Sequence, residues 1–326
     1  MRLGIHVGHW EGEPHDVAAL AREAESCGLD SVWVSETWGS DAVVLATWIA
    51  AATTWIGIGT GVLQMPARTP TAAAMSALTI DHLSGGRFRL GLGVSGPQVA
   101  EGWHGEPFVD PIGRTREYVD VVRRVLARQG AVTAPGPHYP LPVGRGRELK
   151  PNVRPLRSDL PIYLAAMGPR NVALAAEIAD GWIPLFFSPE HADAFELPAV
   201  SEGFDVAPMV PCALDDDVAA AREMLRPTIA LYVGSFGSRK TNFYRDLVVR
   251  FGFGDAARAI QDAALGGRRG DAVAAVPDAL IDAVALIGPP QAVRERLGAF
   301  ADAGVTTLLA RVDDVRTVRA LAEAAS

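Results

Sequence analysis

The chain alternates between short apolar runs and amphipathic segments, and this alternation constrains the fold more than any other feature of the sequence. Apolar runs of this length favour β-strands, and the segments between them repeat their apolar residues with a helical period. Strands separated by helices pair in parallel, so the sequence predicts an α/β fold built on a parallel sheet. The runs that predict strands are 3–8, 31–36, 55–64, 88–94, 161–167, 181–187, 205–214 and 306–312.

The segments between these runs carry the signals that begin and end helices. In segment 14–27 apolar residues recur at positions i, i+3, i+4 and i+7, and Gly28 follows as a C-terminal stop. Helices are predicted in the same way after most of the other runs. They cover 41–53, 70–83, 113–129, 169–179 and the segment after the last strand.

A parallel sheet of this size can close into a (β/α)8 barrel or stay open as a doubly wound sheet. The count of eight strands, without a composition change that would mark a second domain, favours the TIM barrel. We therefore expect a single domain over residues 1–326 with two insertions. Residues 132–159 form an irregular insertion rich in Pro, Gly and Arg, and residues 217–286 form a helical insertion before the last strand.

Composition excludes several classes of function. The formal net charge of −8 argues against nucleic-acid binding, because phosphates need a basic surface. No apolar stretch is long enough to span a membrane, and no secretory signal precedes the first strand, so a cytoplasmic protein is expected. Two cysteines and scattered histidines provide no metal site. A small-molecule substrate is the expected partner.

Small residues end two neighbouring strands at the predicted mouth of the barrel, where such enzymes bind ligands. The sequences IGTGV at 58–62 and LGLGVSG at 90–96 allow close approach to the backbone. Relief of crowding inside the barrel is one explanation, and a flat ligand lying against the mouth is the favoured one. The segment 168–171 opens a helix, where free amides and Arg170 form either an anion site or a plain helix start.

Much of the chain resembles the luciferase-like monooxygenase superfamily, most closely its coenzyme F-420-dependent oxidoreductases of actinobacteria. The most specific block is DHLSGGRFRLGLGVSGPQ at 81–98. The resemblance implies a barrel that holds a deazaflavin, coenzyme F-420 (F420 below), at its mouth, with FMN as the alternative cofactor. The similar segments are 30–42, 56–70, 78–105, 114–127, 160–187 and 242–253.

The resemblance also implies which residues hold the cofactor. In the deazaflavin branch the ring rests on a bulge in the third strand, which falls on Gly61–Val62 and implies a cis peptide bond there. The remaining contacts fall at the ends of the third, fourth and fifth strands. The cofactor-binding residues implied are Thr60, Gly61, Val62, Gln64, Val94, Ser95, Gly96, Ala166, Met167, Gly168 and Arg170.

Proton transfer is less determined, because Gly96–Pro97 stands where some members of the family have a glutamate. Glu36 and His9 are the catalytic candidates, with a group on the substrate as the third; an ion-pair role is the alternative for Glu36. Aromatic and imidazole side chains predict an apolar or aromatic substrate, unless Trp10 and Trp38 only plug the mouth. The expected substrate contacts are Trp10, Trp38, Trp103, His104 and Phe187.

The function implied by this resemblance is hydride transfer between C5 of the deazaflavin and a small organic substrate. An FMN-dependent luciferase-like monooxygenase on the same barrel is the first alternative. A barrel that binds a flavin-like ligand without turnover is the second. The resemblance implies a homodimer, while the sequence itself leaves the oligomeric state open.

Overall fold

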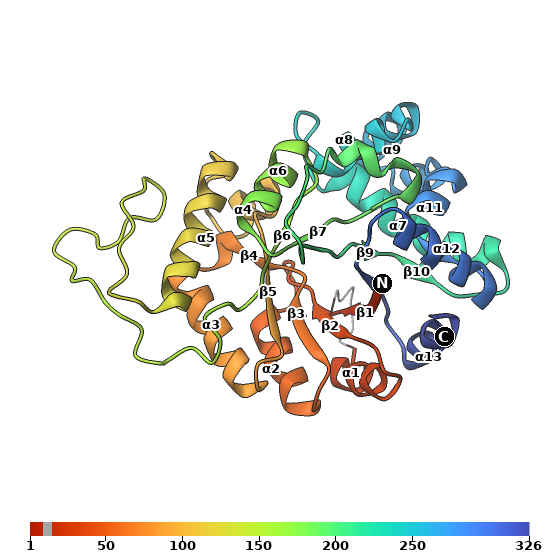
Figure 1. The fold of residues 1–326 in the computed structure, drawn as a ribbon. Helices are drawn as coiled ribbons and strands as arrows, with labels where there is room; N and C mark the ends of the chain where they lie inside the picture. The colour runs from red at the N-terminus through yellow and green to blue at the C-terminus, as the bar shows by residue number, and fades with distance from the viewer. Residues whose placement is uncertain (9–14, 326) are drawn as a thin grey trace.

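In the computed structural model, which describes residues 1–8 and 15–325, parallel strands lie at the centre and helices surround them (Figure 1). One strand position is divided into β8 (Asp205–Val206) and β9 (Met209–Val210). The third position is also divided, into β3 (Gly57–Thr60) and β4 (Leu63–Gln64). The other barrel strands are β1 (Arg2–Val7), β2 (Ser31–Val34), β5 (Phe88–Gly93), β6 (Ile162–Ala165), β7 (Gly181–Ile183) and β12 (Thr307–Arg311).

The divided strand from β8 to β9 closes the ring. β8 pairs with β7, β9 pairs with β12, and β12 pairs with β1, all in parallel. Between β8 and β9, the amide of Ala207 donates to the carbonyl of Trp182 (2.8 Å), and the amide of Leu309 donates to the carbonyl of Pro208 (2.9 Å). When β3–β4 and β8–β9 are each counted as one divided strand, every barrel strand therefore has two neighbours, and the predicted (β/α)8 barrel is confirmed.

Most barrel helices lie within three residues of their predicted bounds. Asp16, Asp41 and Thr69 cap three of them, because each side chain accepts a hydrogen bond from an amide of the first turn. The predicted ones are α1 (Val17–Ser26), α2 (Ala42–Ala52), α3 (Pro70–Leu83), α5 (Pro111–Ala127), α6 (Pro169–Ile178) and α13 (Val315–Ala325). The unpredicted ones are η1 (Met65–Ala67), α4 (Pro97–Gly102), η2 (Pro189–Phe195) and α12 (Pro290–Asp302).

Several predicted strands are longer than the observed ones, and the sixth and seventh differ most. The sixth, predicted to residue 187, ends at Ile183, and Phe186 beyond it has a left-handed backbone (φ 57°) that no strand accommodates. The seventh, predicted over 205–214, leaves the barrel after Val210. Its last part, β10 (Cys212–Ala213), pairs instead with β11 (Leu286–Ile287) in a separate two-stranded sheet.

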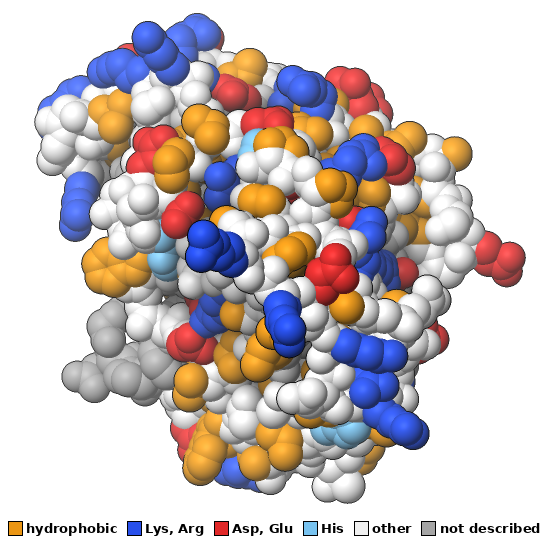
Figure 2. All heavy atoms as spheres, turned by 90° about the vertical axis from the view of Figure 1, so that its left-hand side faces the viewer, with side chains coloured by type: hydrophobic (Ala, Val, Ile, Leu, Met, Phe, Trp, Pro, Cys, Tyr) orange, Lys and Arg blue, Asp and Glu red, His pale blue; other side chains and the backbone are white. Residues whose placement is uncertain are grey.

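The segment between α5 and β6 contains isolated antiparallel bridges, Val132 with Leu149 and Ala134 with Leu141, and otherwise irregular chain. It extends away from the barrel in Figure 1. Figure 2 views the molecule from this side and shows hydrophobic, basic and acidic side chains interspersed over it. Across residues 1–8 and 15–325, no helix combines the length and the apolar character needed to cross a bilayer.

The segment before β11 is helical, as expected. Gly252 and Gly267 follow two of its helices with positive φ (91° and 75°), the backbone conformation that commonly ends a helix. Its helices are α7 (Val218–Ser235), α8 (Phe243–Arg250), α9 (Gly254–Leu265), α10 (Arg269–Ala274) and α11 (Asp278–Val284).

A small cluster of side chains fills the barrel interior. Trp33 and Tyr163 pack edge to face with ring centroids 4.9 Å apart, and Ile183 and Leu309 complete the layer. A side chain at Gly59 would enter the Trp33 ring, since its Cβ would lie 2.3 Å from ring atoms. This layer forms a rigid floor beneath the C-terminal ends of the strands.

Asp30 and Arg89 form an ion pair at the opposite end of the barrel (Oδ2 to Nη1, 2.7 Å). Burial opposes ionisation of Asp30, but the hydrogen bond and charge of Arg89 outweigh it and lower the pKa of the carboxyl. Because folding lowers the pKa of Asp30, its ionised carboxylate stabilises the fold at pH values above its pKa in the unfolded chain, about 3.9. This stabilisation is lost as the pH falls through the lower pKa that Asp30 has in the folded protein.

We expect Asp30→Asn to lower the free energy of unfolding by roughly 1.5–3 kcal/mol at pH 7, because a hydrogen bond to a charged group is lost. Below pH 4 the free energy of unfolding of the wild type should approach that of the variant. Urea unfolding between pH 3 and 7 measures both curves, and parallel curves over that whole range would contradict the assignment.

Candidate active site

An open cavity of about 1290 Å³, its solvent-filled mouth included, lies over the C-terminal ends of the strands. Val62, Ala165 and Met209 line it and also pack on the interior layer around Trp33, so the layer is the floor of the cavity. A cavity at this end of a (β/α)8 barrel is where such folds place their active sites.

A bulge interrupts the third strand at the floor of the cavity. The peptide bond between Gly61 and Val62 is cis, as the family resemblance implied. Beside it, the Thr60 hydroxyl donates to the carbonyl of Gly91 (2.7 Å) and accepts from the amide of Gly91 (2.9 Å). These two bonds join the bulge to β5, and Val62 lines the cavity.

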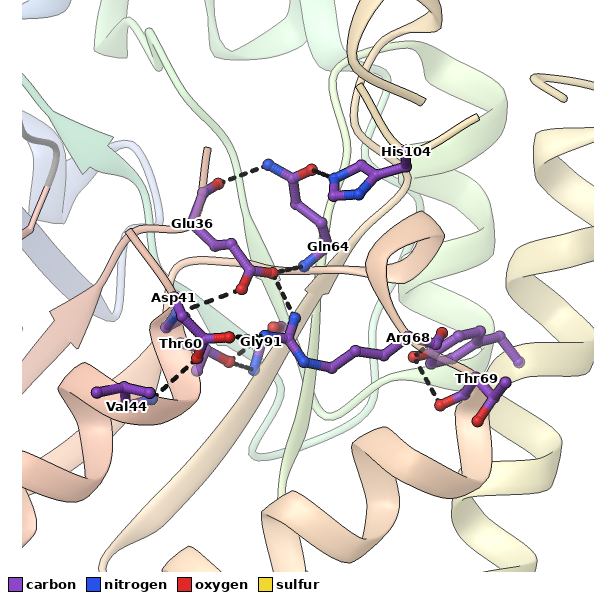
Figure 3. A network of polar contacts seen from close by, with 11 residues as sticks. Glu36, Asp41, Val44, Thr60, Gln64, Arg68, Thr69, Gly91 and His104 are labelled. Atoms are coloured by element: carbon purple, nitrogen blue, oxygen red, sulfur yellow. Dashed lines mark hydrogen bonds and ion pairs between the residues drawn. The ribbon is translucent and has the colours of Figure 1, made fainter. Parts of the chain in front are cut away.

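A polar network holds the chain that follows the bulge (Figure 3). The buried carboxylate of Glu36 accepts hydrogen bonds from the amide of Gln64 (2.8 Å), from Nη1 of Arg68 (2.8 Å) and from the amide of Ala42 (3.3 Å). In return, Nε2 of Gln64 donates to the carbonyl of Glu36 (2.8 Å). Glu36 thus joins β2, α2 and β4, and the ion-pair role considered for it is present.

Many of the predicted site residues line this cavity together. They come from the ends of β2, β4, β5 and β6 and from the bulge between β3 and β4. They are Glu36, Trp38, Gly61, Val62, Gln64, Val94, Ser95, Gly96, Ala166, Met167 and Gly168. His9 and Trp10 lie outside the described residues.

Other predicted contacts do not line the cavity. Thr60 is fully buried and uses its hydroxyl on Gly91, so it supports the bulge from behind. Trp103 is 65% exposed and is not part of the cavity lining. Arg170 is exposed on the first turn of α6. His104 contacts the cavity only through Gln64, whose Oε1 lies 3.0 Å from its Nε2.

The prediction that Phe187 lines the cavity is wrong, and the neighbouring Phe186 lines it instead. It is 3% exposed and stacks on Phe195 (centroids 5.5 Å apart) in the layer between barrel and helices. The left-handed backbone at Phe186 turns the chain beyond the end of β7, so Phe186 and not Phe187 lines the cavity.

Two groups of cavity residues were not predicted from the sequence. His6 and Ser35 lie at the ends of β1 and β2, with Nε2 of His6 2.6 Å from Oγ of Ser35. The position of His6 between Ile5 and Val7 was the available signal, since alternation turns it inward when its neighbours face the helices. The second group is aromatic and comes from α7 and α8, with Tyr232, Phe236, Phe243 and Tyr244.

Burial keeps one of these aromatic groups protonated. The pKa of the Tyr244 phenol is raised strongly, first by burial and then by the neighbouring Tyr232.

Within residues 1–8 and 15–325, no three His, Cys, Asp or Glu side chains gather closely enough to hold a metal ion.

Comparisons with known proteins agree with this geometry. The family described as luciferase-like monooxygenase matches residues 2–307. The chain is 44% identical to a Mycobacterium tuberculosis protein that carries the name coenzyme F420-dependent oxidoreductase Rv3520c, over 99% of this chain and 98% of that protein. It is 29% identical to the 5,10-methylenetetrahydromethanopterin reductase of Archaeoglobus fulgidus, with 91% and 89% of the two chains covered.

Solved structures share the fold over nearly the full length. The coenzyme F420-dependent tetrahydromethanopterin reductase of Methanopyrus kandleri superposes with a TM-score of 0.82 at 24% identity, covering 98% of this chain and 97% of that one. From the family match and the full-length relative together, the chain belongs to the luciferase-like monooxygenase family.

Proposed function

We propose that this chain is an F420-dependent oxidoreductase that transfers a hydride between the deazaflavin and a small organic substrate. The observation that carries the proposal is the cavity at the C-terminal ends of the strands, with the strand bulge at Gly61–Val62 on its floor, in a chain 44% identical to a protein named for F420. Relatives named as reductases and dehydrogenases support the same class of reaction.

The side chains around the bulge fit a flat, fused ring. Between the bulge and the start of α6, six lining residues are glycine or alanine, and we call them the small-residue wall; they are Gly61, Gly93, Gly96, Ala165, Ala166 and Gly168. A Cβ at Gly93 would lie 2.5 Å from Cγ2 of Val62, so a larger residue would displace the bulge. Such a wall lets a planar group lie against backbone.

When bound, the deazaflavin carries the hydride at ring position C5. The chain supplies binding and orientation: the bulge and small-residue wall support the ring, and the aromatic side chains of α7 and α8 exclude water. Glu36 acts in this proposal through Gln64 and β4, because its carboxylate already accepts three hydrogen bonds. His9 keeps its place as a candidate for proton transfer.

A titration with both cofactors tests the proposal. We expect F420 to bind at least tenfold more tightly than FMN, a difference of about 1.4 kcal/mol. Ring fluorescence measures each affinity with oxidised and reduced cofactor. Tighter binding of FMN would favour the monooxygenase alternative, and F420 bound without hydride transfer to any of a broad substrate panel would favour the non-catalytic barrel.

Arg170 follows Gly168 on the first turn of α6, where no side chain caps the helix. In the proposal it contacts the cofactor phosphate. We expect Arg170→Ala to weaken F420 binding by about 1–3 kcal/mol through loss of a charge-assisted contact, with thermal stability of the apoprotein unchanged. An equal loss of apoprotein stability would instead identify Arg170 as a structural ion-pair residue.

The proposal includes a homodimer and a cytoplasmic location. The exposed apolar side chains of α2 and α3, among them Val44, Trp48, Met75 and Leu83, support association of two copies. Analytical ultracentrifugation decides the first point, and a strictly monomeric protein would exclude it. Both cysteines are free, which agrees with a reducing compartment, and cell fractionation decides the second point.

A further inference from the structure

The cavity has two walls of different chemistry. The lining also contains an aromatic wall, which consists of Trp38, Phe186, Tyr232, Phe236, Phe243 and Tyr244. Tyr232 and Phe236 stack with centroids 4.3 Å apart, and Phe236 lies 5.3 Å from Trp38. A ligand in this cavity can therefore contact both aromatic side chains and the backbone of small residues.

Charge in the cavity is low and largely compensated. Glu36 is paired with Arg68 (2.8 Å), and the guanidinium of Arg311 lies 3.9 Å from Asp313. Among the described lining residues, Arg311 is the only Lys or Arg. A phosphorylated substrate would need several cationic or amide donors at one point, so this lining favours an uncharged ligand.

A hydroxyl–imidazole pair also lines the cavity, beside the bulge. Oγ of Ser35 and Nε2 of His6 are 2.6 Å apart, and Nε2 is 3.2 Å from the carbonyl of Gly61 in the bulge. Both side chains are buried and both line the cavity. A serine hydroxyl can accept one hydrogen bond while it donates another, so Ser35 can join a ligand oxygen to the imidazole.

We propose that the substrate is an uncharged compound with an apolar ring and one carbonyl or hydroxyl oxygen. The aromatic wall binds its ring, and the Ser35–His6 pair binds its oxygen. This inference rests on the proposed function for the direction from which the hydride arrives, but the binding site consists of residues of this chain alone.

The pair also accounts for the proton of the reaction. Reduction of a carbonyl adds a hydride to its carbon, supplied by the reduced deazaflavin of the proposed function, and a proton to its oxygen. The Ser35 hydroxyl donates that proton and regains one from the His6 imidazolium, which becomes a neutral imidazole and is reprotonated from solvent. Oxidation of the alcohol is the same sequence reversed. Among the described residues, His6 contacts Ser35 and the carbonyl of Gly61, and Arg311 is paired with it on the neighbouring strand β12.

Binding of three probes to the F420-loaded protein tests the inference. Acetophenone has the apolar ring and the carbonyl, and ethylbenzene has the ring alone. Glucose 6-phosphate has no apolar ring and carries a negative charge. We expect acetophenone to bind about tenfold more tightly than either of the others in equilibrium dialysis. Glucose 6-phosphate binding as tightly as acetophenone would overturn the proposal.

Variants separate the two parts of the site. Phe236→Ala should weaken both ring probes about tenfold, and Ser35→Ala should remove the preference for acetophenone over ethylbenzene. Ser35→Thr keeps a hydroxyl and should restore that preference. The matched control is Trp55→Ala, an exposed tryptophan that does not line the cavity, which should bind like wild type. An unchanged preference in Ser35→Ala would overturn the role of the pair.

Imidazole ¹⁵N spectra provide a readout without turnover. The His6 signals, identified by their loss in His6→Gln, should shift with acetophenone and not with ethylbenzene, while His82 on α3 should respond to neither. Unshifted His6 signals at saturating acetophenone would contradict the contact. The same probes bound to the apoprotein distinguish the two proposals: failure of F420 to bind, with ring probes still bound, would contradict the cofactor and leave the substrate site standing.

Discussion

Arg68→Ala should lower the free energy of unfolding by about 3–5 kcal/mol, because removing one partner of a buried ion pair leaves the other charge uncompensated. Nη1 of Arg68 lies 2.8 Å from Oε2 of Glu36, and the two side chains are only 16% and 6% exposed. Arg68 also contacts Asp41, the cap of α2. The variant should bind F420 more weakly as well, since Glu36 positions Gln64 beside the bulge.

Urea unfolding followed by circular dichroism measures this loss. The double variant Glu36→Gln with Arg68→Ala should recover part of the stability, because it removes the buried charge along with its partner. Arg116→Ala is the matched control, since Arg116 pairs with Glu177 on the surface, and it should unfold like wild type. An Arg68→Ala protein as stable as Arg116→Ala would show that solvent reaches Glu36 and that the network does not support the fold.

Gly91→Ala should lower the free energy of unfolding by about 3 kcal/mol or more, at the upper end of the cost of overpacking. A Cβ at Gly91 would lie 1.9 Å from the carbonyl oxygen of Thr60 and 3.0 Å from Ile183. The obstacle is backbone, and it directly precedes the bulge, so relief requires β3 and β5 to separate. That movement would also break the two hydrogen bonds between Thr60 and Gly91.

Differential scanning calorimetry measures the loss of stability. A titration with F420 measures affinity, which we expect to be about tenfold weaker in the variant. Gly102→Ala on α4 is the control, because no atom lies within 4 Å of the Cβ it would add. Its stability should be unchanged or higher by up to about 1 kcal/mol, since alanine favours helix. Wild-type stability in Gly91→Ala would mean that β3 and β5 can move apart at little cost.

Helix bounds followed from local signals. Helix α3 begins at Pro70 and ends at Leu83, as predicted, because a proline at its first turn, a capping Thr69 and an apolar repeat all act within one segment. The strand ends were less accessible. Val210 is the last residue in the barrel because β10 pairs with β11, a partner more than 70 residues away in the sequence.

The site residues likewise differ in whether nearby sequence was enough to predict them. Gly61, Val62 and Gly96 line the cavity, and they were predicted there from the glycine-rich strand ends and from the family resemblance, which implied the bulge. Phe187 was placed on the wrong side, because whether a residue after Ile183 faces the cavity depends on the left-handed turn at Phe186.

Local patterns in the sequence predicted the order of strands and helices and the glycine-rich ends of the third and fourth strands, because hydrophobic period, caps and glycine spacing are local properties. Only the tertiary structure decided that Glu36 is bound by Arg68, that Ser35 meets His6 across β1 and β2, and that α7 and α8 bring an aromatic wall to the cavity. These contacts join residues far apart in the chain. Their geometry depends on how the barrel closes and how the insertion packs against it, which no local pattern of residues encodes.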